Sequence, residues 1–162
     1  DCRTLANLIT RGALGSLERL FLNGHAIGDA GLQALAGALA SGSVPRLSRL
    51  DLDGNQVGDA GVEAFAQACA SGKLRALSSL NLSKNRVGDA GATALSRALA
   101  GGCVPNLKLL DLSDNEIGTG GMQAFSSAIA NQSSIVKLVV PSPHKRSPSL
   151  RKACSKVGVE VL

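Results

Sequence analysis

The chain repeats one 15-residue pattern four times at a fixed interval of 30 residues. The copies are LERLFLNGHAIGDAG, LSRLDLDGNQVGDAG, LSSLNLSKNRVGDAG and LKLLDLSDNEIGTGG, beginning at Leu17, Leu47, Leu77 and Leu107. They share the form L-x-x-L-x-L-x-x-N-x-[I/V]-G-[D/T]-x-G, except that His25 replaces the asparagine in the first copy. A period of this length is typical of proteins that stack one small structural unit on the next. It therefore predicts a solenoid.

The first half of each copy alternates as a strand does. In the second copy Leu50 and Leu52 alternate with Arg49, Asp51 and Asp53. Such a period of two places the leucines on one side of an extended segment and the polar residues on the other. The predicted strands cover residues 19–22, 49–52, 79–82, 109–112 and 137–140.

The second half of each copy has the spacing of a helix. Asn55 ends the strand, because its side-chain amide can bond the backbone of a tight bend. We expect Asp59 to cap the helix of its own copy by accepting from amides two and three residues on. An apolar stripe through Phe65 and Cys69 follows, and Gly72 ends the helix. The predicted helices cover residues 30–41, 60–71, 90–100 and 120–130.

A glycine recurs in the first turn of every predicted helix, at positions 31, 61, 91 and 121. Glycine is a poor helix former, so its recurrence there needs a reason other than helix propensity. We expect the backbone to approach the strand layer closely at these positions, rather than to form a phosphate-binding loop.

The motif, the 30-residue length and the helical second half resemble the leucine-rich repeats of the ribonuclease-inhibitor-like subfamily, over roughly residues 3–140. Cytosolic innate-immune receptors, Ran GTPase-activating proteins, tropomodulin-like actin caps and ribonuclease inhibitor share this repeat. Strands pack about 4.8 Å apart but helices about 8–10 Å apart, so stacked copies must bend. We therefore expect an α/β leucine-rich-repeat solenoid, a horseshoe arc with a parallel concave sheet and convex α-helices.

We predict a single domain over residues 1–162. Its predicted parts are a partial N-terminal repeat at 1–16, four repeats at 17–134, and a short repeat with a basic C-terminal cap at 135–162. Ile9 and Gly12 match Leu39 and Gly42 of the first full copy, so the chain opens inside a helix whose own strand is absent. We expect it to be a piece of a longer array. The cap is predicted to hold a helix at 150–156 and an edge strand within 159–162.

The net charge of +5 comes from the C-terminal tail, since residues 1–134 carry 11 basic and 11 acidic side chains. A basic tail suits nucleic acid, anionic lipid or an acidic protein, and the alternative is a solvated cap helix. We expect no nucleic-acid partner, because the chain has no Trp or Tyr on which bases could stack. No apolar run approaches the roughly 20 residues of a membrane span, so we expect a cytoplasmic protein with reduced, structural cysteines.

Catalytic and metal-binding patterns are lacking. The segment DLDGN from Asp51 is similar to a calcium loop, but its glycine comes two positions early and no glutamate occupies position twelve. His25 stands where the other copies have Asn, which favours a hydrogen-bonded turn side chain over a catalytic base. No nucleophile, base and orienting group occur together. We predict no enzyme, no metal or other cofactor, and no small-molecule substrate.

The candidate binding surface is the solvent side of the predicted strands. Its residue types change between copies, whereas small alanines dominate the helices. The candidate partner-binding residues are Arg19, Phe21, Arg49, Asp51, Asp53, Asn81 and Asp111. Aromatic residues beside arginines are favoured anchors, although a preceding repeat could instead shield Phe21. We predict a non-catalytic protein–protein interaction module whose protein partner the sequence does not identify. The alternative is a regulator of an enzyme such as a small GTPase.

Overall fold

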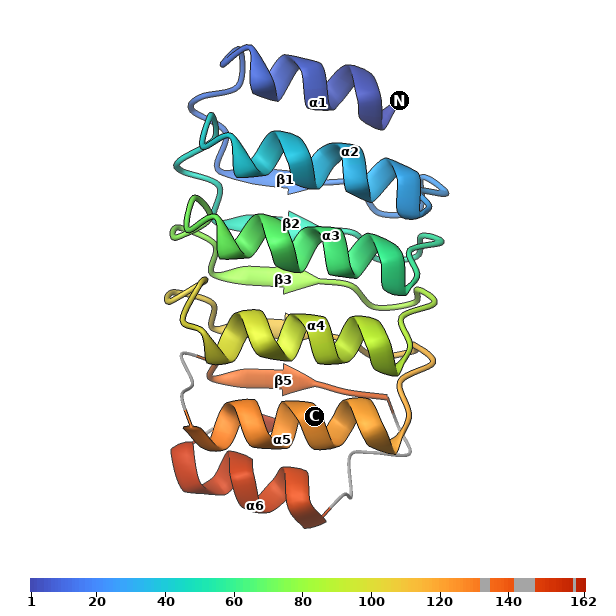
Figure 1. Cartoon of the computed structure of the whole chain (residues 1–162), viewed down its shortest axis with the longest axis vertical. Coiled ribbons are helices and arrows are strands. Elements are labelled where there is room, and N and C mark those ends of the chain that lie inside the picture. Colours follow the sequence, from blue (N-terminus) through green and yellow to red (C-terminus); the bar gives the residue numbers. More distant parts are fainter. Residues whose placement is uncertain (132–134, 142–147, 159) are drawn as a thin grey trace.

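The computed structural model describes residues 1–131, 135–141, 148–158 and 160–162, in which helices and strands alternate (Figure 1). The helices are α1 (Cys2–Thr10), α2 (Asp29–Ala40), α3 (Asp59–Ala70), α4 (Asp89–Ala100), α5 (Thr119–Asn131) and α6 (Pro148–Val157). The strands are β1 (Arg19–Phe21), β2 (Arg49–Asp51), β3 (Ser79–Asn81), β4 (Leu109–Asp111), β5 (Lys137–Val139) and β6 (Glu160–Val161). They form one parallel sheet in the order β1-β2-β3-β4-β5-β6.

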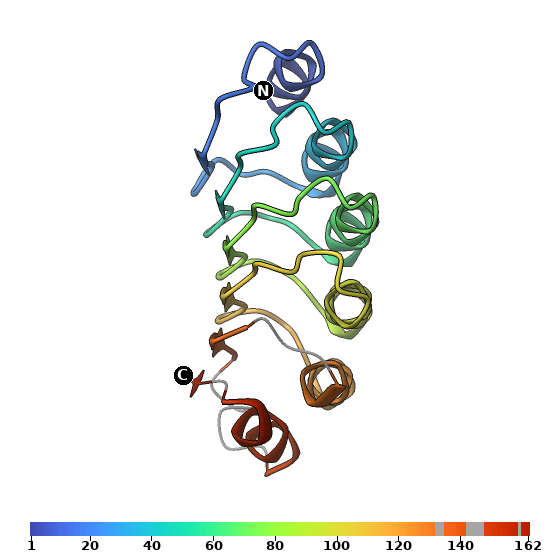
Figure 2. The same cartoon turned by 90° about the vertical axis from the view of Figure 1, so that its left-hand side faces the viewer.

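The stack bends as the unequal spacings of strands and helices require. Figure 2 shows the helices along the outer side of the arc and the strands along its inner side. Strands lie closer together than packed helices do, so the sheet takes the concave side. The predicted α/β solenoid with a parallel concave sheet and convex helices is confirmed.

Leucines of successive strands form the inner wall of the core. They pair in register, so each buried leucine lies beside its equivalent in the next copy. The buried strand residues are Leu20, Leu50, Leu80, Leu110 and Leu138, and the helix residues facing the core include Leu35, Phe65, Leu95 and Phe125. One apolar cluster runs from Ala6 to Cys154. The sheet is therefore backed by a continuous core along the whole array.

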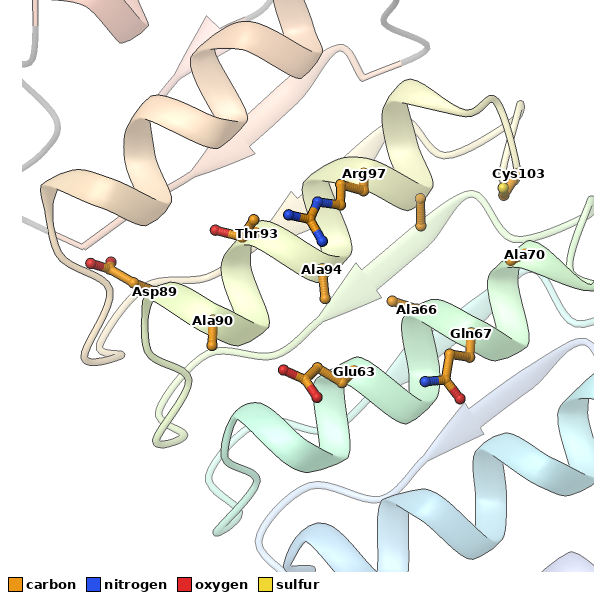
Figure 3. Close-up of a pocket in the computed structure, with 11 residues that line it drawn as sticks. Glu63, Ala66, Gln67, Ala70, Asp89, Ala90, Thr93, Ala94, Arg97 and Cys103 are labelled. Atoms are coloured by element: carbon orange, nitrogen blue, oxygen red, sulfur yellow. The ribbon is translucent and has the colours of Figure 1, made fainter.

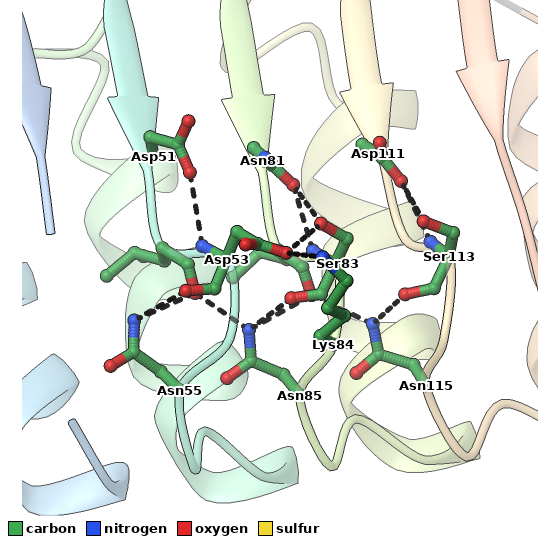
Figure 4. Close-up of polar contacts among 12 residues, drawn as sticks. Asp51, Asp53, Asn55, Asn81, Ser83, Lys84, Asn85, Asp111, Ser113 and Asn115 are labelled. Carbon is green, nitrogen blue, oxygen red and sulfur yellow. Dashed lines mark hydrogen bonds and ion pairs between the residues drawn. The ribbon is translucent and has the colours of Figure 1, made fainter. Parts of the chain in front are cut away.

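Three asparagines tie the bends of neighbouring copies together. This asparagine ladder consists of Asn55, Asn85 and Asn115 (Figure 4). In its middle member, the Oδ1 atom accepts from the Val57 N–H of the preceding copy at 3.0 Å. The Nδ2 atom donates to the carbonyls of Leu52, Leu82 and Ser83 at 2.8, 3.1 and 3.0 Å. The predicted bend bonds are confirmed, and each amide also joins two copies.

The aspartate at the start of each helix caps a different helix from the one predicted. Gly58 is the N-cap of α3, and no side chain caps that end from its own copy. The Oδ1 atom of Asp59 instead accepts from Gly88 and Gly91 at the start of α4, at 2.7 and 2.9 Å. Asp29 and Asp89 act likewise on α3 and α5. The prediction was wrong because helices stacked side by side bring each carboxylate to the free amides of the next helix, where a negative charge is favourable.

The same arrangement explains the recurrent glycine in the first helical turn. A Cβ atom on Gly91 would lie 2.7 Å from Oδ1 and 3.1 Å from Cα of Asp59. The close approach is therefore to the preceding helix, and the prediction of an approach to the strand layer was wrong. The predicted stop at Gly72 is confirmed, since its φ of +69° is a left-handed conformation that glycine adopts without strain.

The C-terminal part adds β5, α6 and β6 to the stack, and α6 and β6 correspond to the helix predicted at 150–156 and the edge strand predicted within 159–162. Lys145 and Arg146 of the predicted basic tail lie outside the described residues, as does His144. None of the helices in the described ranges is both long and apolar enough to cross a lipid bilayer.

Candidate functional site

Three rows of side chains cross the concave face, because the strands pair without a shift in register. The first row is Arg19, Arg49, Ser79 and Leu109. The second row is Phe21, Asp51, Asn81 and Asp111. The third row is Asn23, Asp53, Ser83 and Ser113, in the bends that follow the strands. All seven candidate residues therefore lie in these three rows.

The second row fixes the bends in three of the four copies (Figure 4). In each, an Asp or Asn oxygen accepts from the backbone N–H two residues on, which is a local bond typical of turns. The pairs are Asp51 with Asp53 at 3.1 Å, Asn81 with Ser83 at 3.0 Å, and Asp111 with Ser113 at 2.9 Å. Three of the seven candidates thus have a structural role that the sequence interpretation did not assign to them.

Arg19, Phe21 and Arg49 form an exposed cluster at the N-terminal end of the face, the arginine–phenylalanine cluster. The Phe21 side chain is 51% exposed, and the Arg49 guanidinium lies over its ring at 5.2 Å from the centroid. A second contact holds Arg49, whose Nη2 atom is 3.7 Å from Oδ2 of Asp51. Arg19 is also exposed. The structure therefore brings together the aromatic residue and the arginine that the sequence singled out.

Asp53 belongs to a second polar group on the same face. The Ser83 Oγ atom lies 2.7 Å from Oδ1 of Asp53 and 2.6 Å from Oδ1 of Asn81. Lys84, which the sequence interpretation missed, places its Nζ atom 3.5 Å from Asp53. Its φ is +52°, at the bend position that Gly54 holds in the preceding copy. That change from glycine to a charged residue is the sequence signal by which Lys84 could have been found.

A groove of about 770 Å³ lies on the opposite, convex face between α3 and α4 (Figure 3). Alanines of both helices line it, together with the charged side chains of Glu63 and Arg97. Asp89 also lines it, but its Oδ1 atom already accepts from Gly118 and Gly121 at 2.7 and 2.9 Å. A smaller groove of the same kind, about 250 Å³, lies between α4 and α5. The linings of the two grooves differ, since the first includes Glu63 and Asp89 and the second includes Ser96 and Ser127.

The remaining titratable groups include side chains of the kinds that hold metal ions. Within the described residues, no group of three or more His, Cys, Asp or Glu side chains is placed to hold a metal ion. His25 is exposed, and the bond at its bend runs from its backbone N–H to Oδ1 of Asn55 at 3.1 Å rather than from its ring.

Comparison with known families identifies the repeat. The family described as Leucine Rich repeat matches residues 16–36, 46–66, 73–96 and 105–126, which make up more than half of the chain. The chain is a leucine-rich-repeat protein. A search of curated proteins found no match to it.

Solved structures share the architecture of this leucine-rich-repeat protein. The tropomodulin C-terminal domain of Caenorhabditis elegans has a TM-score of 0.78 at 13% identity, over 98% of this chain and 91% of that chain. Leiomodin-1 actin-binding site 2 has a TM-score of 0.75 at 16% identity, over 94% of this chain and 84% of that chain. At such low identity the likeness establishes the fold alone.

Proposed function

We propose that this leucine-rich-repeat protein is a non-catalytic recognition module that holds a protein partner on its concave face. The observation that carries the proposal is the first row, which changes from arginine to serine to leucine along the array. Unlike the second row, it does not supply the acceptors that fix the bends. The convex helices instead repeat small alanines. Partner choice requires side chains that differ along the surface, and the first row supplies them without taking part in the bends.

Two finer predictions belong with this proposal. The 30-residue period with an α-helix in every full copy supports the ribonuclease-inhibitor-like subfamily. The alternative function, regulation of a small GTPase, has no residue in the described part of the chain that favours it. An extended concave surface suits an elongated protein segment better than a small molecule, which is bound in an enclosed pocket.

Charge reversal on the two faces tests the proposal. The concave variant carries Arg19→Glu with Arg49→Glu, and it leaves Asp51 unchanged because that carboxylate holds a bend. The convex control variant carries Gln67→Glu with Arg97→Glu, in the lining of the groove between α3 and α4. Proteins captured by the wild-type chain are identified by mass spectrometry, purified and titrated against both variants.

We expect the purified partner to bind the convex variant with the affinity it has for the wild type. It should not bind the concave variant. Both variants should retain the circular dichroism and urea midpoint of the wild type, since all four sites are at the surface. A partner that binds the concave variant but no longer binds the convex variant would contradict the proposal.

Actin is a defined protein for a first titration, because one structural neighbour is titled an actin-binding site. Purified monomeric actin is added to the wild-type chain and to the two variants. Binding that depends on the concave pair would name a partner. Absence of binding would remove actin and leave the face to be tested with captured proteins.

A further inference from the structure

The first copy departs from the rule that the other three follow in the second row. Phe21 pairs in register with Asp51, and positions 51, 81 and 111 all hold an oxygen acceptor that fixes a bend. A phenyl ring offers no acceptor to the N–H of Asn23. The first copy therefore gives up a local hydrogen bond and leaves half of an aromatic side chain exposed. In exchange the ring gains a contact with Arg49.

The ring is nevertheless held in place. The Arg49 guanidinium at 5.2 Å is within the distance of about 6 Å at which a cation is attracted to a ring face. Asp51, two residues further along the same strand, also holds that guanidinium, with its Oδ2 atom 3.7 Å from Nη2 of Arg49. An exposed aromatic side chain that is already ordered loses little conformational freedom on binding. Aromatic residues and arginines of this kind dominate the binding energy of protein interfaces.

The charges around the ring determine what it accepts. Asp51 already serves both Arg49 and the N–H of Asp53, so its carboxylate is in use. Arg19 is exposed and has no ion-pair partner among the described residues. Alternate residues of a strand are about 6–7 Å apart on one face. Arg19 and Phe21 thus present a cation and an apolar ring at that separation.

We propose that the arginine–phenylalanine cluster anchors a protein segment that presents a carboxylate to Arg19 and an apolar side chain to Phe21, about 6–7 Å apart. This inference rests on the proposed concave-face function and specifies the chemistry of its partner. In an extended partner, the two side chains stand two residues apart. The acidic group pairs with the exposed cation, and the apolar group covers the exposed part of the ring.

Selection of peptides tests this chemistry directly, because it does not require the natural partner. The probe is a random library of linear 12-residue peptides displayed on phage and selected on the immobilised full chain. We expect enriched sequences to carry Asp or Glu two positions from Leu, Ile, Phe or Trp. One enriched peptide is then synthesised, and its dissociation constant is measured for the wild type and for each variant.

Phe21→Asn is the decisive variant, because it restores the acceptor that the third copy has at Asn81 and should fold. We expect it to weaken binding by about thirtyfold, the loss typical of a dominant interface residue. Arg19→Glu should weaken binding about tenfold, and exchanging the acidic residue of the peptide for Lys should recover part of that loss. As controls, Leu8→Ser removes an exposed apolar side chain from α1 and Arg97→Glu reverses a convex charge. Both controls should leave the dissociation constant within about twofold, as expected for residues outside the interface.

The outcomes separate this inference from the function on which it rests. Peptides that lose affinity when Asp53 or Lys84 is reversed, but not with Phe21→Asn, would overturn the inference and leave the concave face as the binding surface. Peptides that depend on Gln67 and Arg97 would overturn both. Failure to enrich any peptide that depends on Phe21 also overturns the inference.

Discussion

Replacing Asn85 by leucine should destabilise the chain through one orphaned amide. Asn85 is 7% exposed and lies between the second and third copies, where its side chain makes four hydrogen bonds to backbone. Leucine has the same branching and the same number of side-chain heavy atoms but makes none of them. The question is which backbone groups are then left without a partner.

Three of the four backbone groups keep a hydrogen-bond partner in the Asn85→Leu variant. The Leu52 carbonyl still accepts from Asn55 at 2.9 Å, and the Leu82 carbonyl from Asn115 at 2.8 Å. The Ser83 carbonyl still accepts from the N–H of Gly54 at 3.0 Å.

The exception is the N–H of Val57, a fully buried residue, whose acceptor is Asn85 at 3.0 Å. One buried donor without an acceptor costs about 1–3 kcal/mol. We therefore expect Asn85→Leu to lower the free energy of unfolding by that amount.

Urea denaturation followed by circular dichroism measures this loss. The matched control is Asn106→Leu, which makes the same chemical change at an exposed asparagine whose Nδ2 donates to the Arg75 carbonyl at 2.8 Å. Water can replace that hydrogen bond, so the free energy of unfolding of the control should fall by less than about 0.5 kcal/mol. Equal losses for Asn85→Leu and the control, at unchanged m-value, would refute the reasoning that the ladder is buried and its amide irreplaceable.

Four further predictions concern stability. Asp59→Ala removes the cap of the next helix and should cost about 0.5–2 kcal/mol in the same urea assay. Gly91→Ala should cost about 1–3 kcal/mol because its Cβ would meet the backbone of Asp59, whereas Gly37→Ala, with nothing within 4 Å, should stabilise α2 by about 0.5–1 kcal/mol. Phe21→Asn should keep or raise the free energy of unfolding, by up to about 1 kcal/mol, and a large loss would mean that the ring is structural. Burial, with a neighbouring thiol, raises the pKa of Cys69 from 9.0 to about 12. The folded chain then holds a proton that the unfolded chain loses, so stability should fall as the pH rises from about 9 towards 12, and less so in Cys69→Ala.

The local features of the fold could be predicted from the sequence because each is encoded within a few residues. Alternation around Leu50, the bend at Asn55 and the stop at Gly72 are signals of this kind, and the structure has all three. The capping partner of Asp59 could not be found in this way. Its hydrogen bonds span 29 and 32 residues and exist only because the helices stack side by side.

The rows of the concave face could be predicted from the sequence, but the contacts within them could not. Alternation placed Asp51 and Asp111 on the solvent side, yet their carboxylates are bound to the bends that follow. An Asp two residues before a bend is a local signal that could have shown this. The position of Arg49 over Phe21 depends on the pairing of two strands 30 residues apart, and no local pattern reports it.

Within each copy, the residues that hold the array together differ from the residues of the first row. The asparagine ladder and the aspartate caps bind each copy to its neighbour through backbone groups, so they hold the array together whatever stands in the first row. First-row side chains are thereby free to change without loss of stability, which is the condition for a surface that selects a partner. Phe21 is an exception among the four full copies, because it takes a position that the other three use to fix a bend. Under the proposed function, the first copy uses for binding a position that the next three copies use to fix a bend.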